Sequence, residues 1–229
     1  MATPLDLRNR RREAQRAVRL ALNAVHAALD DWKAAVADGK HAATALTNAA
    51  LTQLHLPALP LGALADVPGL RPAAAAKLAA QQAAALADLS GCLERLTAVV
   101  AALEAAAAGL QELAQREAEA PLLGEGAVFA ALPLHLLGRM LCEVAVQHRA
   151  ELAVKEGVVG GFTLVLGELP VADQPGGSDG GTGRAAAARE ERLRRSMQVH
   201  VAAWMLSAEV DDPRVDGHLA AVAAEMKGF

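Results

Sequence analysis

The chain has very few aromatic residues. Its 229 residues include no tyrosine, three phenylalanines and two tryptophans, so aromatic side chains make up only 2% of the sequence. β-branched residues are also sparse outside a few valines. Strands favour aromatic and β-branched residues, whereas the Ala, Leu, Glu, Gln and Arg that are abundant here favour helices. The composition therefore argues against a sheet-rich fold and predicts an all-α protein.

Cysteine and net positive charge are also scarce. The two cysteines, Cys92 and Cys142, lie among apolar residues and cannot build a disulfide framework, which favours a reducing compartment. The net charge of −4 does not suggest the broad basic surface of a general nucleic-acid binder. We therefore expect no direct sequence-specific nucleic-acid partner. Two arginine clusters, at residues 8–19 and 189–195, are interpreted as solvated helix faces.

Long apolar runs are missing as well. The most apolar stretch, TAVVAALEAAAAGL, is interrupted by Glu104, and no run of 18 or more apolar residues occurs. A membrane span is therefore not expected. The Arg-rich start lacks the uninterrupted apolar stretch of a secretory signal. A lipid-surface role for this basic start is a further alternative, although its apolar seam is narrower than a membrane-binding face.

The sequence shows no pattern typical of a catalytic, metal-binding or phosphate-binding site. The seven histidines show no close metal-binding spacing. The segment GGSDGGTG lacks the Lys-Ser/Thr ending of a phosphate-binding loop. Cys142 and His148 fall on one predicted helix, six residues apart, where the base cannot reach the nucleophile. We therefore expect a non-enzymatic protein with no catalytic residues, no metal and no cofactor.

The sequence does contain two long heptad patterns. Apolar residues at alternating steps of three and four indicate the seams of a helix over residues 9–54 and of another over residues 73–119. The first seam consists of Val18, Leu22, Val25, Leu29, Trp32 and Val36, and the second includes Leu86, Leu89, Leu93, Leu96, Val100 and Leu103. Small residues continue the first seam at Gly39, where close helix approach is expected. Four prolines at 57–72 interrupt the pattern, so we predict a long antiparallel helical hairpin, coiled-coil-like in packing.

The hairpin defines the first of two predicted regions. Residues 1–120 form the long helical hairpin, with residues 57–72 as a Pro-rich connector. Residues 121–229 form a C-terminal helical unit. Its helices are expected from about residue 127 or 134 to 159, over 185–207, and over 215–227. A flexible Gly-rich insert is expected over about residues 160–184, because its glycine-rich tail has low complexity.

The two tryptophans are the most informative single residues. An alanine-rich core buries little area per residue, so we expect closely packed helices or help from a partner chain. Trp32 lies on the first seam, and Trp204 precedes the acidic turn SAEVDDPRVDG. Each could be core or an interface anchor, since tryptophan is enriched where interfaces concentrate their binding energy. In the acidic turn, Asp211, Asp212 or Asp216 is expected to cap the last helix.

Three blocks of the sequence resemble the cyclin-dependent kinase 2-interacting protein family. FAALPLHLLGRMLCEVAVQHRAELAVKEGVV carries a Phe, a Pro four residues later and an Arg-x-Glu-Leu motif. DDWKAAVADGKHAATALTNA is similar to the family's N-terminal helix, and the stretch from His200 to Leu219 is similar to its C-terminal element. The residues of these blocks that we expect to bind partners are Trp32, Phe129, Arg149, Glu151, Leu152, Trp204 and His218. Arg149 and Glu151 are expected on an exposed polar face near the docking surface.

The resemblance implies a non-enzymatic adaptor or scaffold subunit of nuclear complexes. Such complexes are linked to DNA replication, cell-cycle kinases and DNA-damage checkpoint signalling. The implied partners are cell-cycle kinases, the subunits of an AAA+ ATPase complex that also acts in ribosome maturation, and a second small helical subunit of that complex. The resemblance implies a nuclear location and allows a cytoplasmic one. Two alternatives stay open: the chain is itself the other small helical subunit, or it is a structural coiled-coil homo-oligomer.

Overall fold

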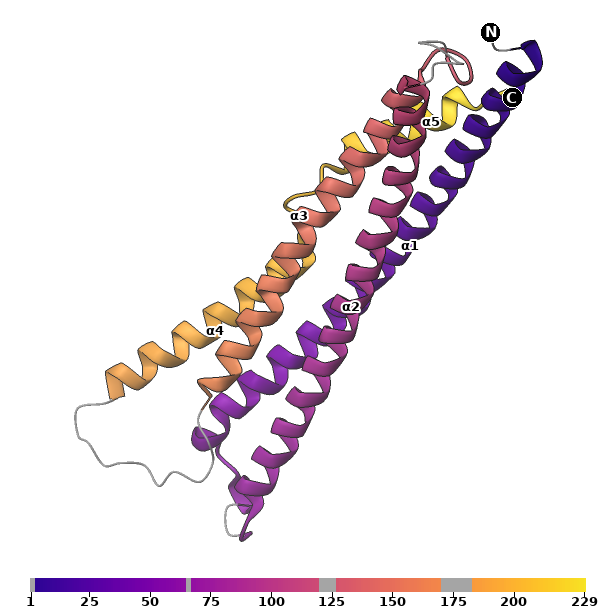
Figure 1. Cartoon of the computed structure of the whole chain (residues 1–229). Coiled ribbons are helices and arrows are strands. Elements are labelled where there is room, and N and C mark those ends of the chain that lie inside the picture. Colours follow the sequence, from indigo (N-terminus) through magenta and orange to yellow (C-terminus); the bar gives the residue numbers. More distant parts are fainter. Residues whose placement is uncertain (1–2, 65–66, 120–126, 170–182) are drawn as a thin grey trace. The chain divides into compact units, whose positions relative to one another are not determined.

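The protein is helical throughout the residues that the structure describes. A computed structural model describes residues 3–64, 67–119, 127–169 and 183–229. It contains the helices α1 (Pro4–His55), α2 (Leu70–Glu119), α3 (Leu134–Gly167), α4 (Gly183–Met205) and α5 (Asp212–Glu225) (Figure 1). No strand occurs within these ranges. The predicted all-α class is confirmed, and so is the long hairpin of α1 and α2.

The chain packs into two compact units. The first unit comprises Met1–Ala34, Arg95–Ala153 and Ser207–Phe229. The second unit comprises Ala35–Glu94 and Val154–Leu206. These units do not follow the predicted boundary at residue 120, because α1, α2 and α3 are long enough to contribute residues to both. Within each unit, segments far apart in the sequence lie side by side.

The heptad positions supply the buried side chains of the hairpin. In the first unit, α1 buries Val18, Leu22, Val25, Leu29 and Trp32, and α2 buries Leu96, Val100, Leu103 and Leu110. In the second unit, α1 buries Gly39, Ala43 and Leu46, and α2 buries Leu89. Spacing of three and four residues places these side chains on one face of each helix. The heptad register read from the sequence therefore identifies the packed faces.

The connector between α1 and α2 is shorter than predicted. Two single 3₁₀ turns, Leu56–Ala58 and Gly62–Leu64, follow α1, and α2 already begins at Leu70. Gly69, with a φ of 76°, takes up the left-handed conformation that lets the chain turn into the helix. Arg71, from the first turn of α2, donates hydrogen bonds to the carbonyls of Pro57 and Leu59 at 3.0 and 2.9 Å. The connector is thus tied to the helix that follows it.

The predicted end of α3 at about residue 159 is wrong, because the helix continues to Gly167. The glycines that suggested a break lie inside the helix. A Cβ atom at Gly161 would overlap the imidazole of His200 on α4, so the glycine allows close approach there. Phe162 and Val165 on the added turns are buried. The part of the predicted insert at residues 170–182, which includes most of GGSDGGTG, lies outside the described residues.

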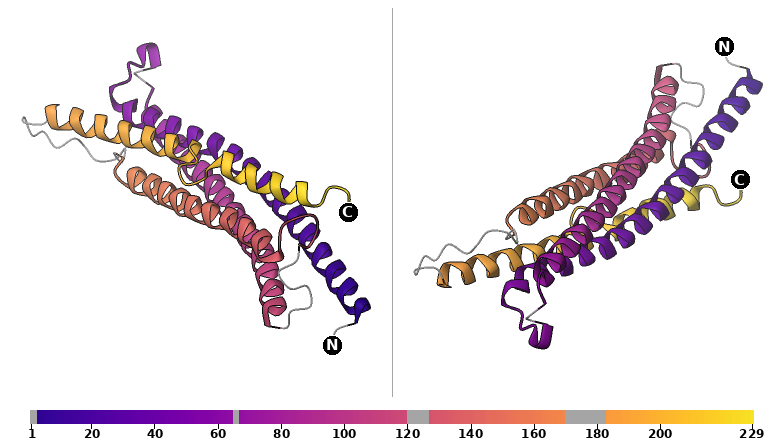
Figure 2. Two further views of the ribbon diagram at one scale, coloured as in Figure 1. Left: turned by 90° about the horizontal axis from the view of Figure 1, so that it is seen from above. Right: turned by 90° about the horizontal axis from the view of Figure 1, so that it is seen from below.

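The C-terminal helices begin and end close to the predicted residues. α4 packs on the second unit's parts of α1 and α3, where Leu193 and Met197 form an apolar cluster with Ala50 and Val165 (Figure 2). Asp211 is the N-cap of α5, because its carboxylate accepts the Arg214 N–H at 3.3 Å. Of the three aspartates proposed as the cap, the structure selects Asp211.

One described helix, Leu70–Ala118, has the length and apolar composition of a membrane-spanning helix. The mean hydropathy of its most apolar window is 1.4, and 39% of that window is buried inside the protein. Core helices of soluble bundles share these properties, so length and composition do not by themselves indicate a membrane.

Candidate functional site

Trp204 lies in a socket made by a glycine. Its side chain is fully buried in the second unit. The indole N–H donates a 3.0 Å hydrogen bond to the backbone carbonyl of Val36 on α1. A Cβ atom at Gly39 would overlap the indole, so this glycine supplies the space that the ring occupies. The close helix approach predicted at Gly39 is confirmed, and the partner helix there is α4.

A buried lysine closes the end of α4 beside this tryptophan. The side chain of Lys155, on α3, is fully buried. Its ammonium group donates hydrogen bonds to the carbonyls of Ala203, Trp204 and Leu206 at 3.1, 2.6 and 2.6 Å. It also lies 5.8 Å from the centroid of the Trp204 ring. The last carbonyls of a helix lack partners within the helix and carry partial negative charge, so a cation at this position stabilises the helix end.

Trp32 packs against a histidine in the first unit. The Trp32 and His148 ring centroids are 4.9 Å apart, with an angle of 83° between the planes. Both side chains are buried. His148 Nδ1 lies 2.8 Å from the carbonyl of Val144, where it donates a hydrogen bond. Burial lowers the pKa of His148 below its ordinary value of 6.5; the bond to Val144 and the charges of Asp212 and Glu151 act in the opposite direction.

The buried histidine predicts a loss of stability in mild acid. Because the folded-state pKa of His148 is lowered, the unfolded chain binds a proton at this residue more readily than the folded chain does. The free energy of unfolding should therefore fall as the pH drops through 6.5. Thermal melts of the parent and of His148→Gln between about pH 7.5 and 5.5 measure this contribution. The variant should show a smaller pH dependence of Tm, and an unchanged dependence would contradict the assignment.

Phe129 belongs to a cluster that holds the C-terminal end of the chain. Its ring lies 5.8 Å from that of Phe229 and 5.5 Å from the guanidinium carbon of Arg19. One carboxylate oxygen of Glu225 accepts the consecutive N–H groups of residues 130, 131 and 132 at 3.1, 2.8 and 3.0 Å. These bonds lower the pKa of the Glu225 carboxyl. The cluster anchors α5 to the segment that precedes α3.

The Arg-x-Glu-Leu motif divides between the surface and the interior of the first unit. Arg149 is exposed and forms a bidentate ion pair with Glu104 of α2, at 2.9 and 2.6 Å. Glu151 and Leu152 are buried. The expectation that Glu151 lies on an exposed polar face is wrong, because its carboxylate accepts the Glu209 N–H at 2.9 Å in the turn before α5. The motif therefore fixes that turn.

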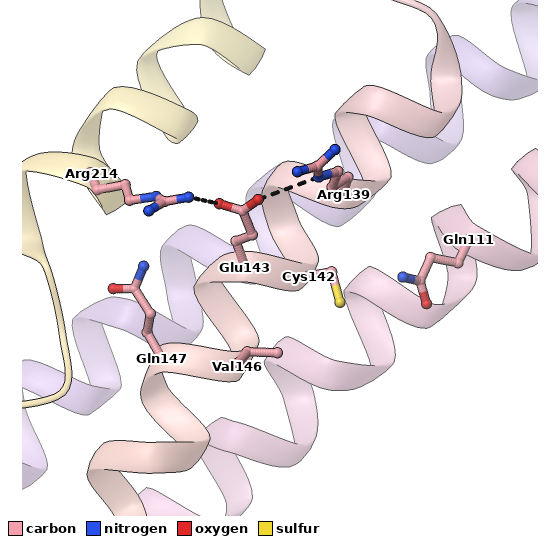
Figure 3. Close-up of a pocket in the computed structure, with 7 residues that line it drawn as sticks. All are labelled: Gln111, Arg139, Cys142, Glu143, Val146, Gln147 and Arg214. Carbon is pink, nitrogen blue, oxygen red and sulfur yellow. Dashed lines mark hydrogen bonds and ion pairs between the residues drawn. The ribbon is translucent and has the colours of Figure 1, made fainter.

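His218 takes part in a charged cluster around Glu143. The Glu143 carboxylate lies 2.9 Å from His218 Nε2, 2.7 Å from Arg214 and 3.4 Å from Arg139. Hydrogen bonds from Arg214 and His218 lower the pKa of Glu143. Figure 3 shows Glu143 between the two arginines, with Cys142 facing the α2 side. These residues line an open pocket of about 300 Å³. This cluster links α3 to α5, and Glu143 was not among the residues singled out from the sequence.

The structure does not gather the seven predicted partner-binding residues into one surface. Trp32, Phe129, Glu151, Leu152 and Trp204 are buried, and only Arg149 and His218 keep substantial exposure. The buried residues stabilise the fold, and Arg149 and His218 are the accessible members of the set. Lys155 was missed because a lysine between a valine and a glutamate resembles a surface residue; its burial follows from the position of α4, which the helical pattern alone does not give.

Neither a group of metal-binding side chains nor a similar known protein assigns a function to the described part of the chain. Within the ranges that the structure describes, no group of three or more His, Cys, Asp and Glu side chains could hold a metal ion. No protein-family model matches the chain, and a search of curated proteins finds no match. The resemblance drawn from the three sequence blocks therefore stays a prediction.

Proposed function

We propose that the chain is a non-enzymatic adaptor whose long helices bind other protein subunits. The observation that carries this proposal is the surface of α2. Among the described residues, the buried side chains of α2 lie on and beside its heptad face. Its exposed positions include many alanines: Ala76, Ala80, Ala83 and Ala87 in the second unit, and Ala98, Ala101, Ala105 and Ala108 in the first.

An exposed alanine surface of this length favours a protein partner. The exposed side of α2 is mixed, because Lys77, Glu94 and Glu104 stand among the alanines, as charged residues do around the rim of protein–protein interfaces. Alanine side chains are short, so another helix could approach the backbone of α2 closely. A membrane would cover α2 as well, but Leu89, Leu96, Leu103 and Leu110 are already buried against this chain's other helices. Insertion into lipid would require α2 to leave that packing.

The finer proposal rests on the resemblance to the cyclin-dependent kinase 2-interacting protein family. We propose a nuclear adaptor or scaffold linked to DNA replication, cell-cycle kinase and checkpoint signalling. Its partners would be subunits of an AAA+ ATPase complex that also acts in ribosome maturation. Two other proposals remain: the second small helical subunit of the same complex, and a coiled-coil homo-oligomer.

Affinity purification of the tagged chain from its own cells, followed by mass spectrometry, tests the proposal. Recovery of AAA+ ATPase subunits in near-stoichiometric amounts supports the adaptor function. Recovery of a member of the cyclin-dependent kinase 2-interacting protein family as a distinct chain would instead favour the second small subunit. Recovery of the chain alone, with a multiple of the 23.6 kDa monomer mass by light scattering, would favour the homo-oligomer and contradict the adaptor.

A further inference from the structure

The first half of α1 carries a row of exposed residues that the packing of the protein does not use. Arg8, Arg12, Arg16, Leu20 and Ala24 follow each other at steps of four, and all five are exposed. We call this row the arginine ridge. Side chains four residues apart form one of the ridges by which helices pack together. The ridge extends about 24 Å along α1.

The arginines of this ridge form no ion pair with the residues that the structure describes. Among the described residues, no carboxylate lies within ion-pair distance of Arg8, Arg12 or Arg16. The second arginine cluster differs, since Arg192, Arg194 and Arg195 of α4 form ion pairs with Glu168 and Glu191. Both clusters lie on exposed helix faces, as interpreted from the sequence. The ridge differs in that three positive charges lie together, in a chain of net charge −4.

The ridge is held in a helical conformation before any partner binds. Thr3 and Asp6 form a reciprocal cap at the start of α1. The Thr3 N–H donates to the Asp6 carboxylate at 2.9 Å, and the Asp6 N–H donates to the Thr3 hydroxyl at 3.2 Å. Such a capping box satisfies two amide groups at the helix start. A partner therefore meets a helix backbone that is already formed, which lowers the entropy cost of binding.

The ridge leads into an apolar groove of the same unit. Ala24 and Ala27 of α1, together with Ala98 and Ala102 of α2, line an open groove of about 370 Å³, and the charged side chains of Asp31 and Arg95 also border it. Leu20, one turn before Ala24, is 60% exposed. The basic row thus leads into a groove of the first unit that is mainly lined by short apolar side chains, with one acidic and one basic residue, Asp31 and Arg95, at its border.

We propose that this surface binds an acidic amphipathic helix of a partner protein. Carboxylates at four-residue spacing on such a helix would face the three guanidinium groups, and its small apolar residues would enter the groove. Leu20 and the alanines offer a phosphate backbone nothing, and a chain of net charge −4 lacks the broad basic surface of a general nucleic-acid binder. A membrane needs a broad apolar face, whereas Ala14 and Val18 of this helix are already buried. The inference rests on the proposed adaptor function and names the chemistry of a partner.

Binding of designed probes to the purified full chain tests this proposal. The probe is a fluorescein-labelled helical peptide of about 20 residues, with glutamate at every fourth position and alanine and leucine on the adjoining face. A peptide with glutamine in place of glutamate, a single-stranded thymidine oligonucleotide and phosphatidylserine vesicles serve as comparison probes. Fluorescence anisotropy and vesicle flotation measure binding at two salt concentrations.

Two sets of variants make the test specific. The triple variant Arg8→Gln, Arg12→Gln, Arg16→Gln should weaken binding of the acidic peptide about tenfold or more. The matched control Lys33→Gln, Lys40→Gln, Lys77→Gln removes the same charge from exposed positions away from the ridge and should leave binding unchanged. Leu20→Gln alters no charge and should also weaken binding. Circular dichroism confirms that each variant remains folded.

Several outcomes would overturn the proposal. These are equal loss in the two triple variants, equal binding of the glutamine peptide, or preference for the oligonucleotide or the vesicles. Retention of cellular partners by the ridge variant would overturn this inference while leaving the adaptor function intact. If the parent chain itself were recovered without partners, the proposed adaptor function would be contradicted.

Discussion

Replacing Trp204 with alanine is expected to lower the free energy of unfolding by about 3–5 kcal/mol, the usual cost of removing a fully buried aromatic side chain. The indole is completely buried and donates its N–H to the carbonyl of Val36. Its removal leaves a cavity between α4 and α1 in the second unit. Urea unfolding followed by circular dichroism measures the loss. A variant as stable as the parent would mean that Trp204 is an exposed anchor.

Gly39 provides the matched test of this contact. In the parent, Gly39→Ala should destabilise, because the new Cβ atom overlaps the indole and overpacking typically costs about 1–3 kcal/mol. In the Trp204→Ala background the same change should be neutral or stabilise by up to about 1 kcal/mol, because alanine favours the helix more than glycine does. An equal change in the free energy of unfolding in both backgrounds would contradict the packing of Trp204 against Gly39.

Replacing Lys155 with methionine is expected to cost about 2–4 kcal/mol, since each buried carbonyl left without a donor costs about 1–3 kcal/mol and water can reach some of them. Methionine keeps most of the apolar volume but cannot donate to the carbonyls of Ala203, Trp204 and Leu206. Lys77→Met, at an exposed position of α2, is the control and should change the free energy of unfolding by less than about 0.5 kcal/mol. Equal urea midpoints for Lys155→Met and the control would rule out the buried role.

The sequence predicted the parts of the fold that depend on periodicity. Heptad spacing identified α1, α2 and their buried faces, because a helix repeats its facing side chains every three or four residues. Proline located the connector, and aspartate located the cap of α5. These features are local, so neighbouring residues in the sequence contain the information. The choice of Asp211 among three aspartates required the observed backbone.

The contacts that hold the C-terminal helices were not predictable in the same way. Gly160 and Gly161 were taken for the start of a flexible insert, whereas α3 passes through them and Gly161 makes room for His200. Glu151 and Lys155 resemble surface residues of an amphipathic helix, and both are buried. Their burial depends on which segment crosses α3, and that segment lies about 50 residues further along the chain.

Most residues expected to bind partners are buried for the same reason, because their burial depends on contacts with distant segments of the chain. The sequence favours the core for Trp32 and Trp204 and leaves an interface role open, and their burial assigns both to the core of their own units. The exposed residues on which the proposals rest are instead alanines of α2 and arginines of α1. Such residues do not stand out in a sequence in which alanine and arginine are both common helix formers.

The central claim is that the exposed alanines of α2 are covered by a partner protein. Ala87→Arg and Ala105→Arg each place a long charged side chain on that surface, one in each unit, and Gln81→Arg places one elsewhere on α2 as the control. The decisive measurement is the amount of partner recovered with each tagged variant from cells, compared with its urea midpoint. We predict that the alanine variants keep the parent's stability within about 0.5 kcal/mol and lose the partners, while the control keeps both. Full recovery of the partners with both alanine variants would contradict the claim.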